Sequence, residues 1–374
     1  MKTLHRVHFR DARDMAFLPD ASVELVLTSP PYPMIGMWDE TFARLSPDAA
    51  AALRRNDGRG AFEAMHRALE PVWREAYRVL APGGFACINI GDATRSVADD
   101  FMLYPNHVRL LAFGLELGFT PLPAILWRKP TNSPTKFMGS GMLPAGAYVT
   151  LEHEYILVLR KGAKREFAEP RPKRLRRESA VFWEERNAWF SDVWTDLRGT
   201  RQDLGAQQTR RRSGAFPFEL AYRLVCMFSS KGDTVLDPFL GTGTTAQAAA
   251  AAGRSSIGLE IETGFRDEVF DGLQGLVSAA RTRIQARIDG HLAFLESCRE
   301  TGRALRHVNR PYGFPVVTSQ EREILLNLPD AVRIHSREGF EVSYRDDPHA
   351  RFGPRESLTP EIRAAAPGGQ LELF

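Results

Sequence analysis

Short apolar runs of strand length alternate with segments of helical periodicity through most of this 374-residue chain. The helical pattern covers residues 61–80, 105–117, 217–228 and 245–252, and the predicted strands are residues 4–9, 22–27, 85–90, 122–128, 155–159, 234–236 and 256–259. Strands separated by helices of this length predict an α/β fold with an open, mostly parallel sheet and helices on both faces.

Apolar residues make up 43% of the chain and charged residues 25%, so a sizeable core can be buried. The sequence contains no run of about 18 apolar residues, the length that a membrane span needs. Residues 1–10 lack the apolar segment of a signal peptide. The cysteines, Cys87, Cys226 and Cys298, stand outside any metal-ligand spacing, so we expect them to be buried and expect no metal site. Sparse cysteine use suits a cytoplasmic protein without a membrane partner.

Residues 235–245 read as a strand, a glycine loop and a helix start. Gly241 and Gly243 would let backbone amides approach a ligand closely, at a helix N-terminus that favours a negative group. Glu260 closes the following strand, where an acid is placed to accept hydrogen bonds from ribose hydroxyls. This unit predicts a nucleoside-containing cofactor, and the alternative is an ordinary tight turn between strand and helix.

The details of the loop narrow the choice of cofactor. Gly243 is followed by Thr244 and Thr245 and not by the lysine of a phosphate-binding P-loop, and the three-glycine dinucleotide fingerprint is absent. A loop that opens with Asp237, Pro238 and Phe239 suits a cofactor with a methionine moiety and no phosphate.

A second motif, Ser29-Pro30-Pro31-Tyr32, follows the strand at residues 22–27. The prolines make the turn rigid, and a carbonyl held outward can accept a hydrogen bond from an amino group. Tyr32 offers a flat face for stacking. Together they suit a flat base with an exocyclic NH2 whose nitrogen attacks a sulfonium methyl, without a covalent enzyme intermediate. Alone, the tetrapeptide could also be a strand-ending turn.

With both motifs in hand, the chain resembles the amino-methyltransferases of DNA, which modify cytosine at N4 or adenine at N6. The resemblance covers about residues 1–265 and implies a Rossmann-like methyltransferase fold with S-adenosyl-L-methionine as cofactor. It makes Ser29, Pro30, Pro31 and Tyr32 the catalytic motif. It implies a cofactor site formed by the following residues: Asp11 at the adenine, Phe216 and Pro217 at the methionine end, Asp237, Pro238, Phe239, Gly241, Gly243, Thr244 and Thr245 in the loop, and Glu260 at the ribose.

The catalytic motif precedes the cofactor loop, which is the permuted order of the family's beta group. Ser29 before Pro-Pro-Tyr resembles the cytosine-N4 enzymes, so a flipped cytosine in double-stranded DNA is the expected target. Adenine N6 methylation is the nearest alternative, a catalytically inactive DNA-binding relative is a further one, and an RNA or protein methyltransferase is a weaker option. A cognate restriction endonuclease acting on the same site is a candidate partner.

The charge distribution suggests where DNA would bind. Residues 160–177 carry nine Lys and Arg against two Glu, and Arg210, Arg211 and Arg212 form a second cluster. We expect phosphate contacts there, although a solvated surface would show the same composition. The expected domains are a catalytic half (1–160), a basic insert as target-recognition region (161–213), a cofactor-binding half (214–265) and a helical and mixed C-terminal extension without a predicted role (266–374).

Overall fold

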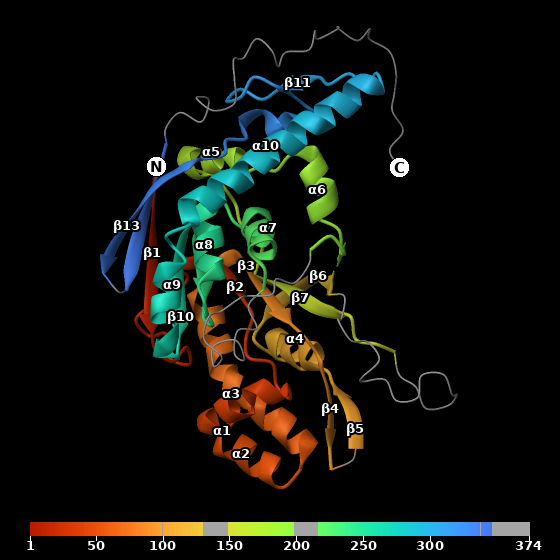
Figure 1. The fold of residues 1–374 in the computed structure, drawn as a ribbon, viewed down its shortest axis with the longest axis vertical. Helices are drawn as coiled ribbons and strands as arrows, with labels where there is room; N and C mark the ends of the chain where they lie inside the picture. Colours follow the sequence, from red (N-terminus) through yellow and green to blue (C-terminus); the bar gives the residue numbers. More distant parts are fainter. Residues whose placement is uncertain (99, 130–148, 198–215, 337, 346–374) are drawn as a thin grey trace.

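The computed structural model describes residues 1–98, 100–129, 149–197, 216–336 and 338–345. Within these residues ten strands form one sheet in the order β13-β14-β1-β10-β9-β2-β3-β7-β6-β8 (Figure 1). The strands are β1 (Lys2–Phe9), β2 (Val23–Thr28), β3 (Leu80–Ile90), β6 (Phe119–Arg128), β7 (His153–Lys161), β8 (Val193–Trp194), β9 (Thr234–Asp237), β10 (Ser255–Glu260), β13 (Pro329–Ser336) and β14 (Gly339–Tyr344).

Helices cover both faces of this sheet, and two small β-ribbons stand outside it. The helices are α1 (Asp39–Leu45), α2 (Pro47–Arg54), α3 (Gly58–Val79), α4 (Asn106–Glu116), α5 (Pro170–Glu178), α6 (Trp183–Trp189), α7 (Phe218–Phe228), α8 (Thr244–Ala251), α9 (Arg266–Asp271) and α10 (Leu276–Glu300). The ribbons pair β4 (Ala93–Val97) with β5 (Asp100–Tyr104) and β11 (His307–Val308) with β12 (Pro315–Val316).

The central strands are apolar on both sides because each face is covered by helices. On β2, Val26 packs in the core with α3 and α4, whereas Leu25 and Leu27 pack in the core with α7 and α8. All three side chains are fully buried, and each such burial contributes roughly 1.5–3 kcal/mol. The continuous apolar run that predicted a central strand therefore has a direct structural cause.

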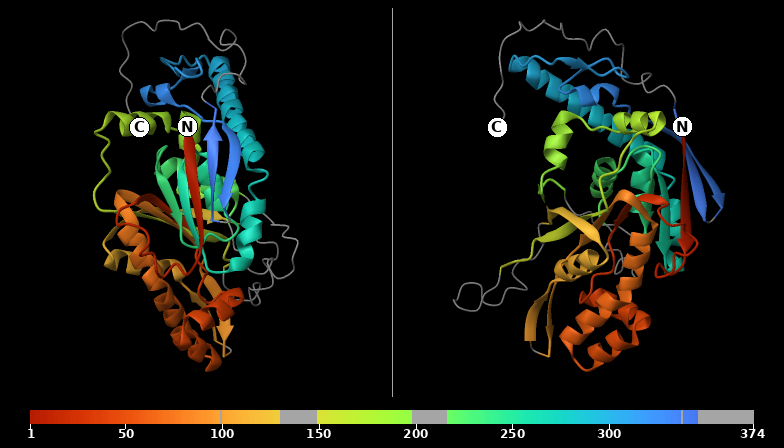
Figure 2. Two further views of the ribbon diagram at one scale, coloured as in Figure 1. Left: turned by 90° about the vertical axis from the view of Figure 1, so that its left-hand side faces the viewer. Right: turned by 180° about the vertical axis from the view of Figure 1, so that it is seen from behind.

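Strands β1, β10, β9, β2 and β3 are mutually parallel, so their carboxyl ends lie at one edge of the sheet. In Figures 1 and 2, α1 and α2 lie beyond this edge, and α5 and β11 lie at the opposite end of the molecule. We call the two edges the carboxyl edge and the amino edge. Neighbouring strands β2 and β9 are far apart in the sequence, and open α/β sheets bind ligands at such a junction.

The predicted fold class is confirmed, and most predicted elements lie within a few residues of the observed ones. One boundary was wrong. The predicted helix ends at residue 80 and the predicted strand begins at residue 85, but α3 ends at Val79 and β3 begins at Leu80, so residues 81–84 belong to the strand. Gly83 and Gly84 form an irregularity within β3: Gly83 has a φ of 77°, and the pairing register with β2 shifts between Val23 and Leu25.

The C-terminal extension also contributes to the sheet. Strand β14 pairs antiparallel with β1, and β13 pairs with β14, so the first and last described strands are neighbours. The long helical stretch expected after residue 264 is present as α9 and α10. In the described part of the chain, no helix is long and apolar enough to cross a membrane. The three cysteines are buried, as expected.

Candidate active site

The two sequence motifs meet at the carboxyl edge because β2 and β9 are hydrogen-bonded neighbours. Leu25 pairs with Val235 and Val26 with Leu236, so both strands end at the same level. One step further on, Thr28 Oγ1 donates a 2.6 Å hydrogen bond to Asp237 Oδ1. This contact joins the strand that carries Ser29 directly to the start of the glycine loop.

Asp237 organises the loop. Besides the Thr28 hydroxyl, its carboxylate accepts hydrogen bonds from Thr245 Oγ1 (2.5 Å) and from the backbone N–H of Phe239 (3.0 Å). Burial raises the pKa of Asp237 to about 6. The side chain therefore ties β2, the loop and the first turn of α8 together, and it still borders the pocket described below.

The glycine loop needs backbone conformations that side chains disfavour. Gly241 and Gly243 have φ values of 55° and 86°, in the left-handed region that favours glycine. Glu260 at the end of β10 accepts hydrogen bonds from the N–H of Gly241 (2.8 Å) and of Glu262 (2.9 Å), and burial raises its pKa. A carboxylate oxygen can accept more than one hydrogen bond, so Glu260 keeps acceptor capacity for a ligand.

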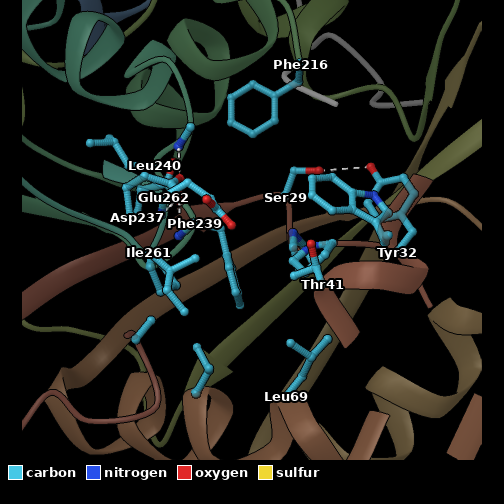
Figure 3. Close-up of a pocket in the computed structure, with 18 of the residues that line it drawn as sticks. Ser29, Tyr32, Thr41, Leu69, Phe216, Asp237, Phe239, Leu240, Ile261 and Glu262 are labelled. Atoms are coloured by element: carbon cyan, nitrogen blue, oxygen red, sulfur yellow. Dashed lines mark hydrogen bonds between the residues drawn. The ribbon is translucent and has the colours of Figure 1, made fainter. Parts of the chain in front are cut away.

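A cavity of about 620 Å³ opens between these motifs, a volume typical of small-molecule sites. Most of the predicted site residues line it: Asp11, Ser29, Pro30, Pro31, Tyr32, Phe216, Asp237, Pro238, Phe239, Gly241, Thr244, Thr245 and Glu260. Pro217 and Gly243 do not line it and instead stand at the N-terminal caps of α7 and α8. Figure 3 shows Asp237, Phe239, Leu240, Ile261 and Glu262 on one side of the cavity, Ser29 and Tyr32 on the other, and Phe216 above the space between them.

The turn after Ser29 is held by a buried amide. Asn106 Nδ2 at the start of α4 donates to the carbonyls of Pro33 (3.0 Å) and Gly91 (2.9 Å), and its Oδ1 lies 3.0 Å from His66 Nε2. Met34, the residue after Pro33, adopts a φ of 66° with its side chain buried. These contacts give the proline-rich turn one defined geometry.

Sequence reasoning missed much of the cavity wall. The segment after Tyr32 supplies Ile35, Met37, Trp38, Thr41 and Leu45, and helix α3 supplies Leu69 and Val72. Trp127 comes from β6, Lys129 follows β6, and Glu154 comes from β7. The 61–80 helix was predicted, but its face toward the site was not. Glu154 directly precedes the predicted strand at residues 155–159, and an acidic side chain at the start of an apolar strand was the available signal.

Asp11 borders the cavity and is also paired with Arg13. Its Oδ1 accepts the Arg13 backbone N–H (2.9 Å), and its Oδ2 accepts Arg13 Nε (2.9 Å) and Nη2 (2.7 Å). Arg13 Nη1 in turn donates to the carbonyl of Leu45 at 3.2 Å, which links this segment to α1. The expected contact between Asp11 and an adenine would therefore be made by a carboxylate that already holds a guanidinium.

The basic stretch at residues 160–177 does not lie beside the cavity. Strand β7 runs from Glu154 at the carboxyl edge to Lys161, whose Nζ donates to the carbonyls of Tyr77 and Leu80. Arg165 forms an ion pair with Asp233, the residue before β9, at 2.8 Å. The exposed helix α5 follows at the amino edge, so its charges are a strand length away from Ser29.

The aromatic part of the insert is anchored in the protein. Trp189 and Trp194 are buried in the core with α7, and Trp183 is partly buried. Arg287 of α10 donates two 2.6 Å hydrogen bonds to Glu185 of α6. Residues 130–148 and the Arg210–Arg212 cluster lie outside the described residues.

Comparison with known proteins identifies the family. Residues 23–271 match the family described as DNA methylase, N6_N4_Mtase. The chain belongs to this family. It is 49% identical to the Type II methyltransferase M.MthZI of Methanothermobacter thermautotrophicus over 347 residues, 92% of this chain and 96% of the relative. It is also 49% identical to the Type II methyltransferase M.MjaI of Methanocaldococcus jannaschii over 271 residues, 70% and 88% of the two chains.

Solved structures agree with this family assignment. The Thermus thermophilus protein TTHA0409, solved with S-adenosyl-L-methionine, is 32% identical and has a TM-score of 0.56 over 73% of this chain and 93% of that one. This chain is a DNA methyltransferase with the mostly parallel, helix-covered sheet of that family.

Proposed function

We propose that this DNA methyltransferase transfers a methyl group to the exocyclic N4 of a cytosine flipped out of duplex DNA. The observation that carries the proposal is the direct junction of Ser29 with the glycine loop, through the Thr28–Asp237 hydrogen bond of 2.6 Å. A base held at Ser29 and a methyl donor held at the loop would share one cavity, which is the arrangement that direct transfer needs.

S-Adenosyl-L-methionine is the methyl donor, and the cavity wall fits it. Apolar side chains of Phe216, Phe239 and Ile261 suit the adenine and the carbon chain, and the carboxylates of Asp237 and Glu260 suit hydroxyl and cationic groups. Glu260 would hold the ribose, Asp11 the adenine, and the loop with Phe216 the methionine end. The cofactor supplies a methyl group on a positively charged sulfur.

On the other side of the cavity, Ser29 Oγ and the Pro30 carbonyl would accept hydrogen bonds from the two amino hydrogens of the base, with the ring stacked on Tyr32. Accepting these hydrogen bonds directs the nitrogen lone pair toward the methyl group. The nitrogen would take the methyl group that the bound cofactor supplies, and it would lose one proton to solvent. A thiol nucleophile is not needed, and all three cysteines are buried.

In the duplex the amino nitrogen is paired and inaccessible, so the base must rotate out of the helix at a cost of a few kcal/mol. Stacking on Tyr32 and contacts to phosphates would offset this cost. Arg128 ends β6 at the carboxyl edge, next to Lys129, which lines the cavity and pairs with Glu154, so Arg128 is better placed for such contacts than α5 at the amino edge. We therefore assign phosphate contacts near the target base to this side.

Cytosine is favoured because Ser29 precedes Pro-Pro-Tyr, as in the cytosine-N4 enzymes that the motif resembles. The order of the two motifs along the chain supports placement in the permuted beta group. Since the named relatives are Type II methyltransferases, we also propose that the methyl group protects a site from a cognate restriction endonuclease.

The test is mass spectrometry of nucleosides from unmethylated DNA incubated with the protein and S-adenosyl-L-methionine carrying a deuterated methyl group. Labelled N4-methylcytosine is the expected product, and Ser29→Ala should reduce its amount strongly. Labelled N6-methyladenine would refute the cytosine assignment while keeping the fold and cofactor. No label with cofactor binding verified would instead favour an inactive DNA-binding relative.

A further inference from the structure

The phenol hydroxyl of Tyr32 sits in a hydrogen-bond network that the catalytic motif alone does not reveal. Its oxygen lies 2.9 Å from Ser29 Oγ, 2.8 Å from Asn89 Nδ2 and 3.0 Å from Glu154 Oε2. Asn89 Nδ2 also donates to Glu154 Oε2 at 2.7 Å, and Lys129 Nζ donates to Glu154 Oε1 at 2.5 Å. Asn89 of β3, Glu154 of β7 and Ser29 after β2 thus contact one tyrosine hydroxyl, and Lys129 after β6 holds Glu154.

The orientation of the Asn89 amide follows from its neighbours. Its nitrogen faces both the phenol oxygen and the Glu154 carboxylate, and an exchange of its oxygen and nitrogen would put two acceptors 2.7 Å apart. Asn89 is therefore a donor to Tyr32. The Glu154 carboxylate, which also accepts a hydrogen bond from Lys129 Nζ, is an acceptor.

The protons of the network can now be assigned. A phenol has one proton and two lone pairs. Tyr32 gives its proton to Glu154 and accepts one from Asn89, so the remaining contact requires the Ser29 hydroxyl to donate to Tyr32. Burial and the charge of Glu154 raise the pKa of Tyr32 well above its ordinary value, which keeps the phenol proton in place.

The network is also sterically confined. A Cβ atom added at Gly91 would lie 3.0 Å from Tyr32 Cε2 and 3.3 Å from Glu154 Cγ, closer than ordinary contacts. Asn89 is 1% exposed. The Tyr32 ring and the Glu154 side chain are therefore held in place from the side of β3.

From these contacts we infer that the Tyr32 hydroxyl, held by Asn89 and Glu154, is a positioning group that fixes the Ser29 hydroxyl proton and leaves only lone pairs on Ser29 Oγ for the substrate. The inference rests on the proposed function, in which Ser29 accepts a hydrogen bond from the target amino group. It deepens that function, because a pocket with this network would bind a base that donates a hydrogen bond to Ser29 and reject a base that can only accept one.

A free serine hydroxyl can rotate and either donate or accept. A serine that only accepts binds an amino group but faces the lone pairs of a carbonyl oxygen unfavourably. Cytosine and uracil differ at this ring position, with an amino group in cytosine and a carbonyl in uracil. The network therefore selects amino-bearing bases over carbonyl-bearing ones before chemistry begins.

The test is a double-mutant cycle on the single-turnover rate of methyl transfer from labelled S-adenosyl-L-methionine. Tyr32→Phe keeps the stacking ring and removes only the hydroxyl. It should slow the reaction about tenfold when Ser29 is present, the effect of one lost hydrogen bond, and less than about twofold in the Ser29→Ala background. Glu154→Gln should show the same dependence on Ser29. Tyr77→Phe, which removes a hydroxyl on α3, is the matched control and should react at the wild-type rate.

A second readout uses a duplex carrying the site mapped by the labelled methyl group, with the target cytosine kept or replaced by uracil. Tyr32→Phe should narrow the wild-type difference in Kd between the two duplexes. An equal slowing by Tyr32→Phe in the wild-type and Ser29→Ala backgrounds, or no slowing in either, would overturn the inference alone. A wild-type rate for Ser29→Ala would overturn the proposed role of Ser29 and the inference with it.

Discussion

Asp237 permits a quantitative prediction. Its carboxylate joins the strand before Ser29 to the glycine loop, and burial raises its pKa. Its side chain is 3% exposed, and burial raises its pKa from 3.8 to about 6. Each pH unit between these values corresponds to 1.36 kcal/mol, so keeping the group charged in the folded protein costs about 3 kcal/mol at neutral pH.

The sign of the effect follows from proton uptake. As the pH falls through about 6, the folded protein binds a proton that the unfolded chain binds only near 3.8. The stability of the wild type relative to a variant that cannot titrate therefore rises, by about 1.4 kcal/mol between pH 7.5 and pH 5.0. Asp237→Asn removes the titration, so the free energy of unfolding of the variant minus that of the wild type should fall by this amount.

Urea unfolding followed by tryptophan fluorescence at both pH values measures this difference. Asp289→Asn, which removes a carboxylate at an exposed position on α10, is the matched control. A variant-minus-wild-type difference for Asp237 that does not change with pH would refute the reasoning that burial controls this carboxyl.

Three further predictions concern binding and catalysis. Tyr32→Ala should lower turnover roughly 5- to 150-fold, because ring stacking is worth about 1–3 kcal/mol. Because the ring lies on the base side, the calorimetric affinity for S-adenosyl-L-methionine should stay within about twofold, and loss of cofactor binding would contradict this division. Glu260→Ala should weaken cofactor binding at least about tenfold by calorimetry, and an unchanged Kd would contradict its role. Reversing the charge of Arg128, whose side chain is 61% exposed, should lower DNA affinity and the salt slope of log K more than reversing one basic residue of α5, and the opposite ranking would move the DNA path to the amino edge.

The sequence predicted the parts of the site that are local. A strand, a glycine loop and a helix start occupy eleven consecutive residues from Val235, and the strand before Ser29 is apolar throughout its centre. Such patterns depend on neighbours along the chain. Because both strands are parallel and central, their motifs could be expected at one edge of the sheet.

Features of the site that depend on the order of strands in the sheet could not be predicted from the sequence. Glu154 reaches Tyr32 only because β7 pairs antiparallel with β3, where Tyr155, the residue after Glu154, is opposite Ile90. Similarly, the basic stretch lies at the amino edge because β7 leads the chain away from the cavity, although its composition alone suggested a DNA surface near the active site. Local periodicity does not determine pairings between distant segments.

The most direct measurement is a crystal structure of the protein with S-adenosylhomocysteine and a duplex carrying the methylated site in its unmethylated form. The expected result is an extrahelical cytosine stacked on Tyr32, with its N4 about 2.7–3.2 Å from Ser29 Oγ and facing the sulfur of the cofactor product. A target base that stays in the duplex, or whose amino nitrogen lies away from Ser29, would contradict the proposed active site.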